Sequence, residues 1–230
     1  MSDLSSEASP IAYPLARNRV TWLVLASLLV TVALPFLGRS RYGDLSNWYS
    51  DHLHHAYATW VFCHRGFEVY ERPLAEVSRG IEFAHPFIGP WGFSPIVYPP
   101  GVFLVFLPLA IVGELVPMSL ATFGALNVAV LVVIAHAALW SAWTALGREP
   151  PGARLLAGAF VWLVLLRLSL NGFYDVVWLA CGAAMVLAVQ KERYGRALLW
   201  AAAAAFLHFR AVSLAPLALF ALLRMVRGKP

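Results

Sequence analysis

The sequence is poor in charge. Only 13% of its 230 residues are Asp, Glu, Lys or Arg, against about 25% in ordinary globular domains. It is 60% hydrophobic, with a mean hydropathy of +0.71. So little polar surface cannot cover a water-exposed fold, which argues strongly against a soluble globular enzyme. The apolar content excludes a disordered chain. The composition predicts a membrane protein with apolar segments of about 20 residues each.

Several chemical signatures are also missing. The two cysteines, Cys63 and Cys181, cannot build a disulfide framework or a zinc finger. There is no Gly-rich phosphate loop, nucleotide fingerprint or Ser/His/Asp arrangement, which argues against an enzyme fed by cytoplasmic ATP or a sugar nucleotide. The net charge of +5 comes mostly from short links between apolar runs. Such links orient a protein in a membrane, so we expect no nucleic-acid partner.

Apolar runs fill most of the chain and predict an all-α, polytopic membrane helical bundle. Residues 1–19 form a cytoplasmic tail, 20–37 the first span, 38–100 a long non-cytoplasmic loop, 101–224 a bundle with short or re-entrant segments, and 225–230 a tail. The runs after the loop are 101–113, 119–146, 155–170, 176–189, 197–209 and 211–223. The bilayer is thus the first expected partner.

The polar links predict the topology. Basic residues gather in 147–154, 190–196 and 224–230, which the positive-inside rule places in the cytoplasm with the N-terminus. With the links on these sides, the run 101–113 cannot cross the membrane by itself. As a helix it would be about 20 Å long, which is shorter than the roughly 30 Å hydrocarbon core. We expect a re-entrant or interfacial piece there; the alternative is a crossing helped by 96–100, with one later link breaking the rule. The last two runs form either two half-length helices or one kinked span.

The loop 38–100 is unlike the rest of the chain. It holds six of the twelve acidic residues and five of the seven histidines, and it is rich in aromatic side chains. The spacing in 44–64 predicts an amphipathic interfacial helix that ends at Gly66. Its aromatic face carries Tyr49, Leu53, Tyr57, Trp60 and His64 and is expected to contact lipid headgroups. Its acidic face carries Asp44, Asn47, Asp51 and His55 and is expected to look towards a cavity.

Polar groups beside apolar runs are the candidate functional residues. They are Asp44 and Asp51 after the first span, the break Asn171–Asp175, and His208 with Arg210. No acidic residue lies within four positions of Arg210, so its anionic partner must come from elsewhere in the fold or from a ligand.

Asp51 and His55 lie four residues apart, a spacing that can hold a divalent metal. A hydrogen-bonded pair is the simpler interpretation, so we expect no metal or other cofactor, with a divalent metal as the alternative. If the groups after the first span, in the break and around Arg210 converge, a carboxylate could deprotonate an attacking hydroxyl while an Arg binds a phosphate. That pairing fits glycosyl transfer from a lipid-linked phosphosugar on the non-cytoplasmic face.

An ordered series of motifs resembles the GT-C superfamily of integral-membrane glycosyltransferases, and most closely the bacterial polyprenyl-phosphate-mannose-dependent type (glycosyltransferase family 87). The series is Gly43-Asp44 with Gly66 and Val69-Tyr70, then Tyr98-Pro99-Pro100 with Pro108, then Asn171-Gly-Phe-Tyr-Asp175, Gly195 and His208-Phe-Arg210 with Pro216. The resemblance covers about residues 20–224, and family members often carry Lys where Arg210 stands.

The resemblance implies roles for these residues. Asp44 is the catalytic base, with Asp51 second, and Arg210 and His208 contact the lipid phosphate of the donor. We expect Asn171, Asp175, His55 and Tyr98 to line the cavity. The donor is a polyprenyl-phosphate sugar, with mannose as one candidate, and the location is the bacterial inner membrane.

Such enzymes are usually longer, with further spans, and this chain matches their N-terminal module. We therefore consider a truncated chain, a minimal enzyme, part of a split enzyme completed by a second membrane subunit, and a module that has lost activity. The alternative function is a non-catalytic membrane subunit that keeps the lipid-binding groove. A transporter is a third option, but the internal repeat of spans expected for it is not found.

Overall fold

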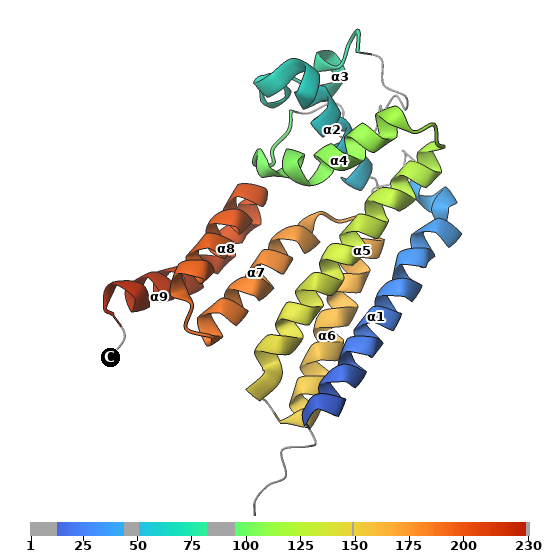
Figure 1. Ribbon diagram of the computed structural model, residues 1–230. Coiled ribbons are helices and arrows are strands. Elements are labelled where there is room, and N and C mark those ends of the chain that lie inside the picture. Colours follow the sequence, from blue (N-terminus) through green and yellow to red (C-terminus); the bar gives the residue numbers. More distant parts are fainter. Residues whose placement is uncertain (1–12, 44–50, 82–94, 149, 229–230) are drawn as a thin grey trace, which may run out of the picture.

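The computed structural model describes residues 13–43, 51–81, 95–148 and 150–228, and these residues form helices and turns without a strand (Figure 1). The predicted all-α class is confirmed for this part of the chain. In chain order the helices are α1 (Tyr13–Leu37), η1 (Arg39–Gly43), α2 (Asp51–Arg65), η2 (Gly66–Tyr70), α3 (Leu74–Val77), α4 (Gly101–Leu115), α5 (Leu120–Ala145), η4 (Leu146–Arg148), α6 (Pro151–Leu170), α7 (Asp175–Gln190), α8 (Tyr194–Leu207), η5 (Phe209–Leu214) and α9 (Ala215–Val226), where η marks a 3₁₀ helix.

Three helical stretches in the described residues are long and apolar enough, by length and composition, to cross a membrane. They are α5, α6 and Phe209–Val226, which joins η5 to α9. Only 17% of the apolar window in α6, and 11% of that in Phe209–Val226, is buried in the protein. Apolar side chains such as Leu156 and Phe160 therefore point outwards. Faces of this kind are stable against lipid rather than water, which marks a membrane protein.

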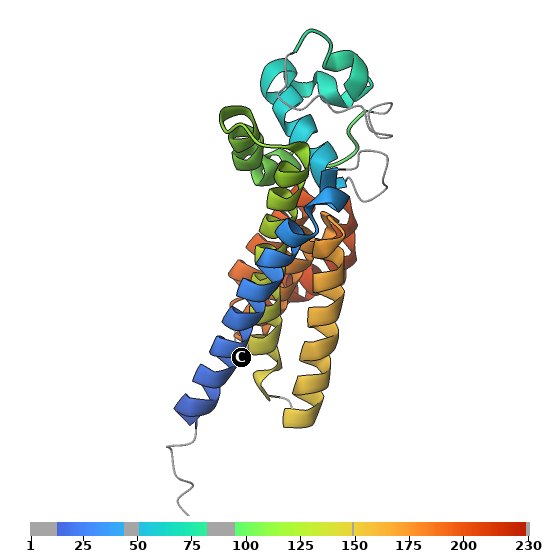
Figure 2. The same cartoon turned by 90° about the vertical axis from the view of Figure 1, so that its right-hand side faces the viewer.

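Helix α5 is the central packing element. It contacts α1, α6 and α7, while α8 packs on α7 and α9 packs on α8, as Figures 1 and 2 show. Gly124 on α5 permits one close approach, because a Cβ there would lie 2.2 Å from the backbone oxygen of Tyr42. This approach seats η1, and with it the chain that follows α1, against the first turns of α5.

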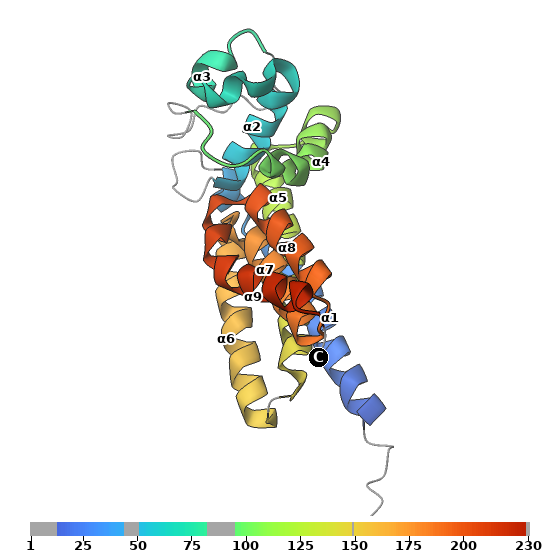
Figure 3. The ribbon, with the colours of Figure 1, turned by 90° about the vertical axis from the view of Figure 1, so that its left-hand side faces the viewer.

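Helix α4 lies across the ends of the longer helices instead of running alongside them (Figures 1 and 3). Its 15 residues span about 22 Å. Ile96–Pro100 does not extend the helix, and whether α4 is interfacial, re-entrant or crossing stays a prediction. The side of the membrane on which it lies stays a prediction.

Helix α2 confirms one prediction and corrects another. It ends at Arg65, and Gly66 follows with a φ of +59°, as expected for a glycine after a helix. The expected lipid-facing aromatic surface is wrong for Leu53, Tyr57 and Trp60, because all three are buried in the protein core. The physical reason is α4, which packs along α2 and covers that face. Tyr49 lies outside the described residues.

Helices α8 and α9 form a hairpin of two short helices. The chain breaks at His208, whose φ of −152° and ψ of 134° are extended. Arg224 and Met225 near the end of α9 line a cavity together with residues at the start of α8, so α9 returns beside α8. The two helices therefore fold back on each other and do not form one continuous span. Because Phe209–Val226 is by itself long and apolar enough to cross a membrane, half-length membrane helices stay a prediction.

Candidate functional site

The link between α6 and α7 is a tight turn that places a carboxylate at a helix start. Gly172 has a φ of +76°, and the Phe173 N–H donates to the Leu168 carbonyl at 3.0 Å. This Schellman-type ending closes α6 and lets Asp175 begin α7 two residues later. A carboxylate in the first turn is favoured by the helix dipole.

Asp175 is the centre of a polar cluster. Its Oδ1 and Oδ2 accept hydrogen bonds from Nη1 of Arg210 at 2.8 and 2.9 Å. Oδ1 also accepts from Trp178 Nε1 at 3.0 Å. The Asp175 side chain is 19% exposed and that of Arg210 58%. The anionic partner that the sequence demanded for Arg210 therefore comes from the fold.

His208 completes this cluster from the α8 side. The Arg210 backbone N–H donates to its Nδ1 at 3.0 Å, so Nδ1 is the acceptor. In the neutral ring the proton then sits on Nε2, which lies 3.5 Å from Asp175 Oδ1. With its side chain 1% exposed, His208 is a buried support for the carboxylate, whereas Arg210 reaches the surface.

Aromatic rings connect the cluster to two further parts of the chain. Tyr98 lies edge-on to His208 with 5.2 Å between ring centroids, and edge-on to His55 at 4.4 Å. The Tyr174 ring is 5.1 Å from His55 and stacks near His208 at 5.8 Å. The structure thus brings together His55, Tyr98, Asp175, His208 and Arg210, which are five of the predicted site residues.

Tyr98 is fixed by hydrogen bonds to η2. The Ile96 N–H donates to the Val69 carbonyl, and the Tyr70 hydroxyl donates to the Tyr98 carbonyl, both at 2.9 Å. Burial raises the pKa of Tyr70 to about 12, so its hydroxyl keeps the proton that it donates. The segment 66–70 therefore sets where the Tyr98 ring lies.

Asn171, the sixth predicted residue, lies at the same link but has a different partner. Its side-chain oxygen accepts from Arg41 Nη2 at 2.6 Å. The neighbouring Tyr42 hydroxyl donates to the Leu170 carbonyl at 2.8 Å, and burial raises the Tyr42 pKa. These two contacts dock the chain that leaves the first helix onto the end of α6.

The two predicted catalytic acids are less well placed. Asp44 follows Gly43 in the sequence but lies outside the described residues. Asp51 is the first residue of α2. The start of α2 adjoins the α6–α7 link, because a Cβ on Gly172 would lie 2.3 Å from His52 Nδ1. The backbone of Asp51 thus begins beside the cluster, and the role of either carboxylate stays a prediction.

The exposed side of Arg210 offers hydrogen-bond donors to an anion. Among the described residues there is no group of three His, Cys, Asp or Glu side chains that could hold a metal ion. Arg210 uses only Nη1 on Asp175, and within the described chain its Nε and Nη2 have no acceptor. Three N–H bonds on an exposed guanidinium edge can bind a phosphate in a fork-like geometry.

Sequence reasoning missed three members of the site. Trp178 lies three residues after Asp175 on a helix, and that spacing alone could have found it. Tyr174 was passed over as part of the break, although its ring is fully buried and its hydroxyl has no described partner. Arg41 gave no signal, because its contact with Asn171 spans 130 residues.

The expected cavity lined by Asn171, Asp175, His55 and Tyr98 stays a prediction, since the cavity described below is lined by other residues. Comparison with known proteins adds no assignment: no family model, no curated protein and no solved structure matches the chain.

Proposed function

We propose that the protein is a multi-pass membrane glycosyltransferase that moves a sugar from a polyprenyl-phosphate donor to an acceptor hydroxyl on the non-cytoplasmic face. The observation that supports this proposal is the Asp175–Arg210 pair with its neighbours His208 and Tyr98. Residues from four distant segments gather here at the end of largely apolar helices, and a guanidinium edge stays open. Polar groups so placed in a membrane protein are functional by default.

The mechanism assigns one task to each group. The open edge of Arg210 holds the donor phosphate, while Asp175, braced by Trp178 and His208, holds Arg210. Asp44 takes the proton from the acceptor hydroxyl, whose oxygen attacks the anomeric carbon of the sugar. The bond from that carbon to the phosphate oxygen breaks, and polyprenyl phosphate leaves with its negative charge facing Arg210. Mannose and the bacterial inner membrane follow from the resemblance alone.

The membrane orientation is part of the proposal. The links 147–154 and 190–196 and the segment 224–230 carry the basic residues and belong to the cytoplasmic end, while the 38–100 loop and the α6–α7 link belong to the other. The donor phosphate would then meet Arg210 near the outer surface of the bilayer.

A non-catalytic membrane subunit is the second candidate, and one observation favours it. Asp175 already neutralises Arg210, so the cluster is balanced in charge without a ligand. A scaffold that keeps this pair for structure would show the same contacts.

Reconstitution in proteoliposomes with a panel of polyprenyl-phosphate sugars separates the two functions. We expect transfer by the wild type and a loss of about 10²- to 10⁴-fold in Asp44→Asn, the usual effect of removing a general base. Glu71→Gln is the matched control, because Glu71 is an exposed acid of the same loop.

Each result has a distinct meaning. A near wild-type rate in Asp44→Asn removes Asp44 from the reaction, and a loss in Asp51→Asn alone moves the role to Asp51. Full activity in both variants, or no transfer by the wild type with any donor, favours the non-catalytic subunit.

A further inference from the structure

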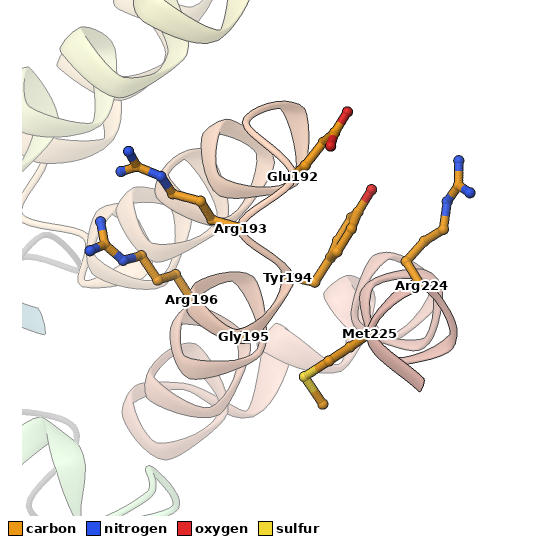
Figure 4. Close-up of a pocket in the computed structure, with 7 residues that line it drawn as sticks. All are labelled: Glu192, Arg193, Tyr194, Gly195, Arg196, Arg224 and Met225. Atoms are coloured by element: carbon orange, nitrogen blue, oxygen red, sulfur yellow. The ribbon is translucent and has the colours of Figure 1, made fainter. Parts of the chain in front are cut away.

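A cavity of about 430 Å³ opens at the opposite end of α7 and α8 from the Asp175 cluster. It is formed where the turn between α7 and α8 meets the end of α9 (Figure 4). Its lining residues are Glu192, Arg193, Tyr194, Gly195, Arg196, Arg224 and Met225. Three arginines against one glutamate give this lining a net positive charge.

Two of the arginines form a pair without an anionic partner. Figure 4 shows the guanidinium groups of Arg193 and Arg196 extending to the same side of the turn, while Glu192 extends to the other. Within the described chain neither guanidinium group makes a hydrogen bond or an ion pair. Like charges on neighbouring side chains repel, and an anion between them would remove that cost.

The third arginine belongs to the opposite wall. The Arg224 guanidinium lies 5.6 Å from the centre of the Phe220 ring, a cation–π distance, and Tyr194 also contacts Phe220 with 6.4 Å between ring centroids. Tyr194 and Arg224 are thus held together at the start of α8 and the end of α9. They add a hydroxyl and a further positive charge to the cavity.

The surroundings of the cavity are apolar. Leu222, Met225 and Val226 on α9 are exposed, as are Leu199 and Trp200 on α8. Exposed apolar faces next to arginines are typical of a helix end at the boundary between acyl chains and headgroups. An inorganic phosphate would use only the arginines, whereas a phospholipid would use the arginines and the apolar faces together.

We propose that this cavity binds an anionic glycerophospholipid, with the phosphate of its headgroup between Arg193 and Arg196. The acyl chains lie along the exposed faces of α8 and α9. The site shares no residue with the Asp175 cluster. The lipid site is therefore independent of the proposed glycosyl transfer, and each can be tested without the other.

The test is native mass spectrometry of the purified protein titrated with phosphatidylglycerol or phosphatidylcholine. We expect the wild type to retain phosphatidylglycerol preferentially. Arg193→Gln with Arg196→Gln should weaken that retention about 30-fold, since each arginine near an anionic lipid surface contributes about 1 kcal/mol. The matched control is Lys191→Gln with Arg227→Gln, which removes two charges at the same end, from residues that do not line the cavity.

A photoreactive phosphatidylglycerol gives a second readout on the unaltered protein. It should label peptides that contain 192–196 or 224–225, and excess inorganic phosphate should not displace it. Equal retention in the cavity variant and the wild type, an equal loss in the control pair, or labelling elsewhere would overturn the lipid site. Displacement by phosphate alone at millimolar concentration would show a phosphate site instead and would also overturn it.

Discussion

Two polar clusters lie within this apolar protein, and they differ in how their hydrogen-bonding capacity is used. One joins α1 to the membrane-length helices α5 and α6 through Ser27, His136 and Trp162. The other surrounds Asp175 and Arg210 at the ends of α7 and α8. The first saturates its hydrogen bonds within the protein, and the second leaves donors at the surface.

The inner cluster is a directed chain of hydrogen bonds. Trp162 Nε1 donates to Ser27 Oγ at 3.1 Å. His136 Nδ1 lies 2.8 Å from the Val132 carbonyl, which can only accept, so this nitrogen carries the proton. His136 Nε2 is then the acceptor for the Ser27 hydroxyl at 3.1 Å. Donors and acceptors match along the whole chain, which is the pattern of a structural contact between helices.

In the outer cluster the acceptor oxygens of Asp175 are occupied, whereas most N–H donors of Arg210 are not. Asp175 accepts three hydrogen bonds. Arg210 contacts it through Nη1 alone, and the Arg210 side chain is 58% exposed. The difference teaches that one cluster is closed within the protein, whereas the other keeps N–H donors at the protein surface. The proposed phosphate contact depends on those donors.

Between the two clusters, the largest expected effect is that of Arg210→Ala on the outer one. We expect kcat/KM for the polyprenyl-phosphate donor to fall about 100-fold, because charge-assisted hydrogen bonds to phosphate are lost and Asp175 is left facing the anion. The free energy of unfolding should change little, since exposed ion pairs contribute about 0–1 kcal/mol. Donor titrations and denaturation in the same detergent measure both quantities.

Arg167→Ala is the control for this comparison, because Arg167 is an exposed arginine near the same end of α6. Arg210→Lys should recover part of the donor affinity, as a single cation still binds phosphate. A stability loss above about 2 kcal/mol with unchanged transfer per folded molecule would make the outer pair structural, like the inner one.

Gly172→Ala tests whether the outer cluster depends on its close backbone approach. The φ of +76° disfavours a side chain, and the new Cβ would lie 2.3 Å from His52 Nδ1. We expect a loss of about 2 kcal/mol in the free energy of unfolding, from the left-handed backbone and the displaced ring.

Gly147→Ala is the matched control, because a Cβ there meets no atom within 4 Å and its φ is ordinary. Thermal unfolding of both variants measures the difference. Equal stability would mean that α2 does not depend on the link for its position.

The sequence predicted the helices well because their limits are local. The polar break at 171–175 ends α6 at Leu170 through Gly172, and His208 separates α8 from η5, as the composition indicated. These boundaries depend on glycines, prolines and charges within a few residues, which a single sequence displays.

Contacts between distant segments were harder to predict. The wrong assignment of Trp60 to a lipid-facing surface arose because an aromatic helix face looks the same whether lipid or α4 covers it. The partners of Ser27 and Arg41 lie more than 100 residues away, and no periodicity relates them. Candidate site residues could be recognised as polar residues that interrupt apolar runs. Which of them contact one another could be learned only from the three-dimensional structure.

The smallest expected effect is that of Ser27→Ala on the inner cluster, and it completes the comparison. The substitution leaves Trp162 Nε1 and His136 Nε2 without the hydroxyl that joins them. Hydrogen bonds between membrane helices contribute about 0.6 kcal/mol on average, so we expect a loss of about 1 kcal/mol for the two. Ser141→Ala is the control, because Ser141 donates only to the Ala137 carbonyl of its own helix. Transfer per folded molecule should stay at the wild-type rate in both variants, since the inner cluster offers a ligand no unused donor. A fall in transfer without a fall in stability would contradict this and would show that the matched cluster also acts in the reaction.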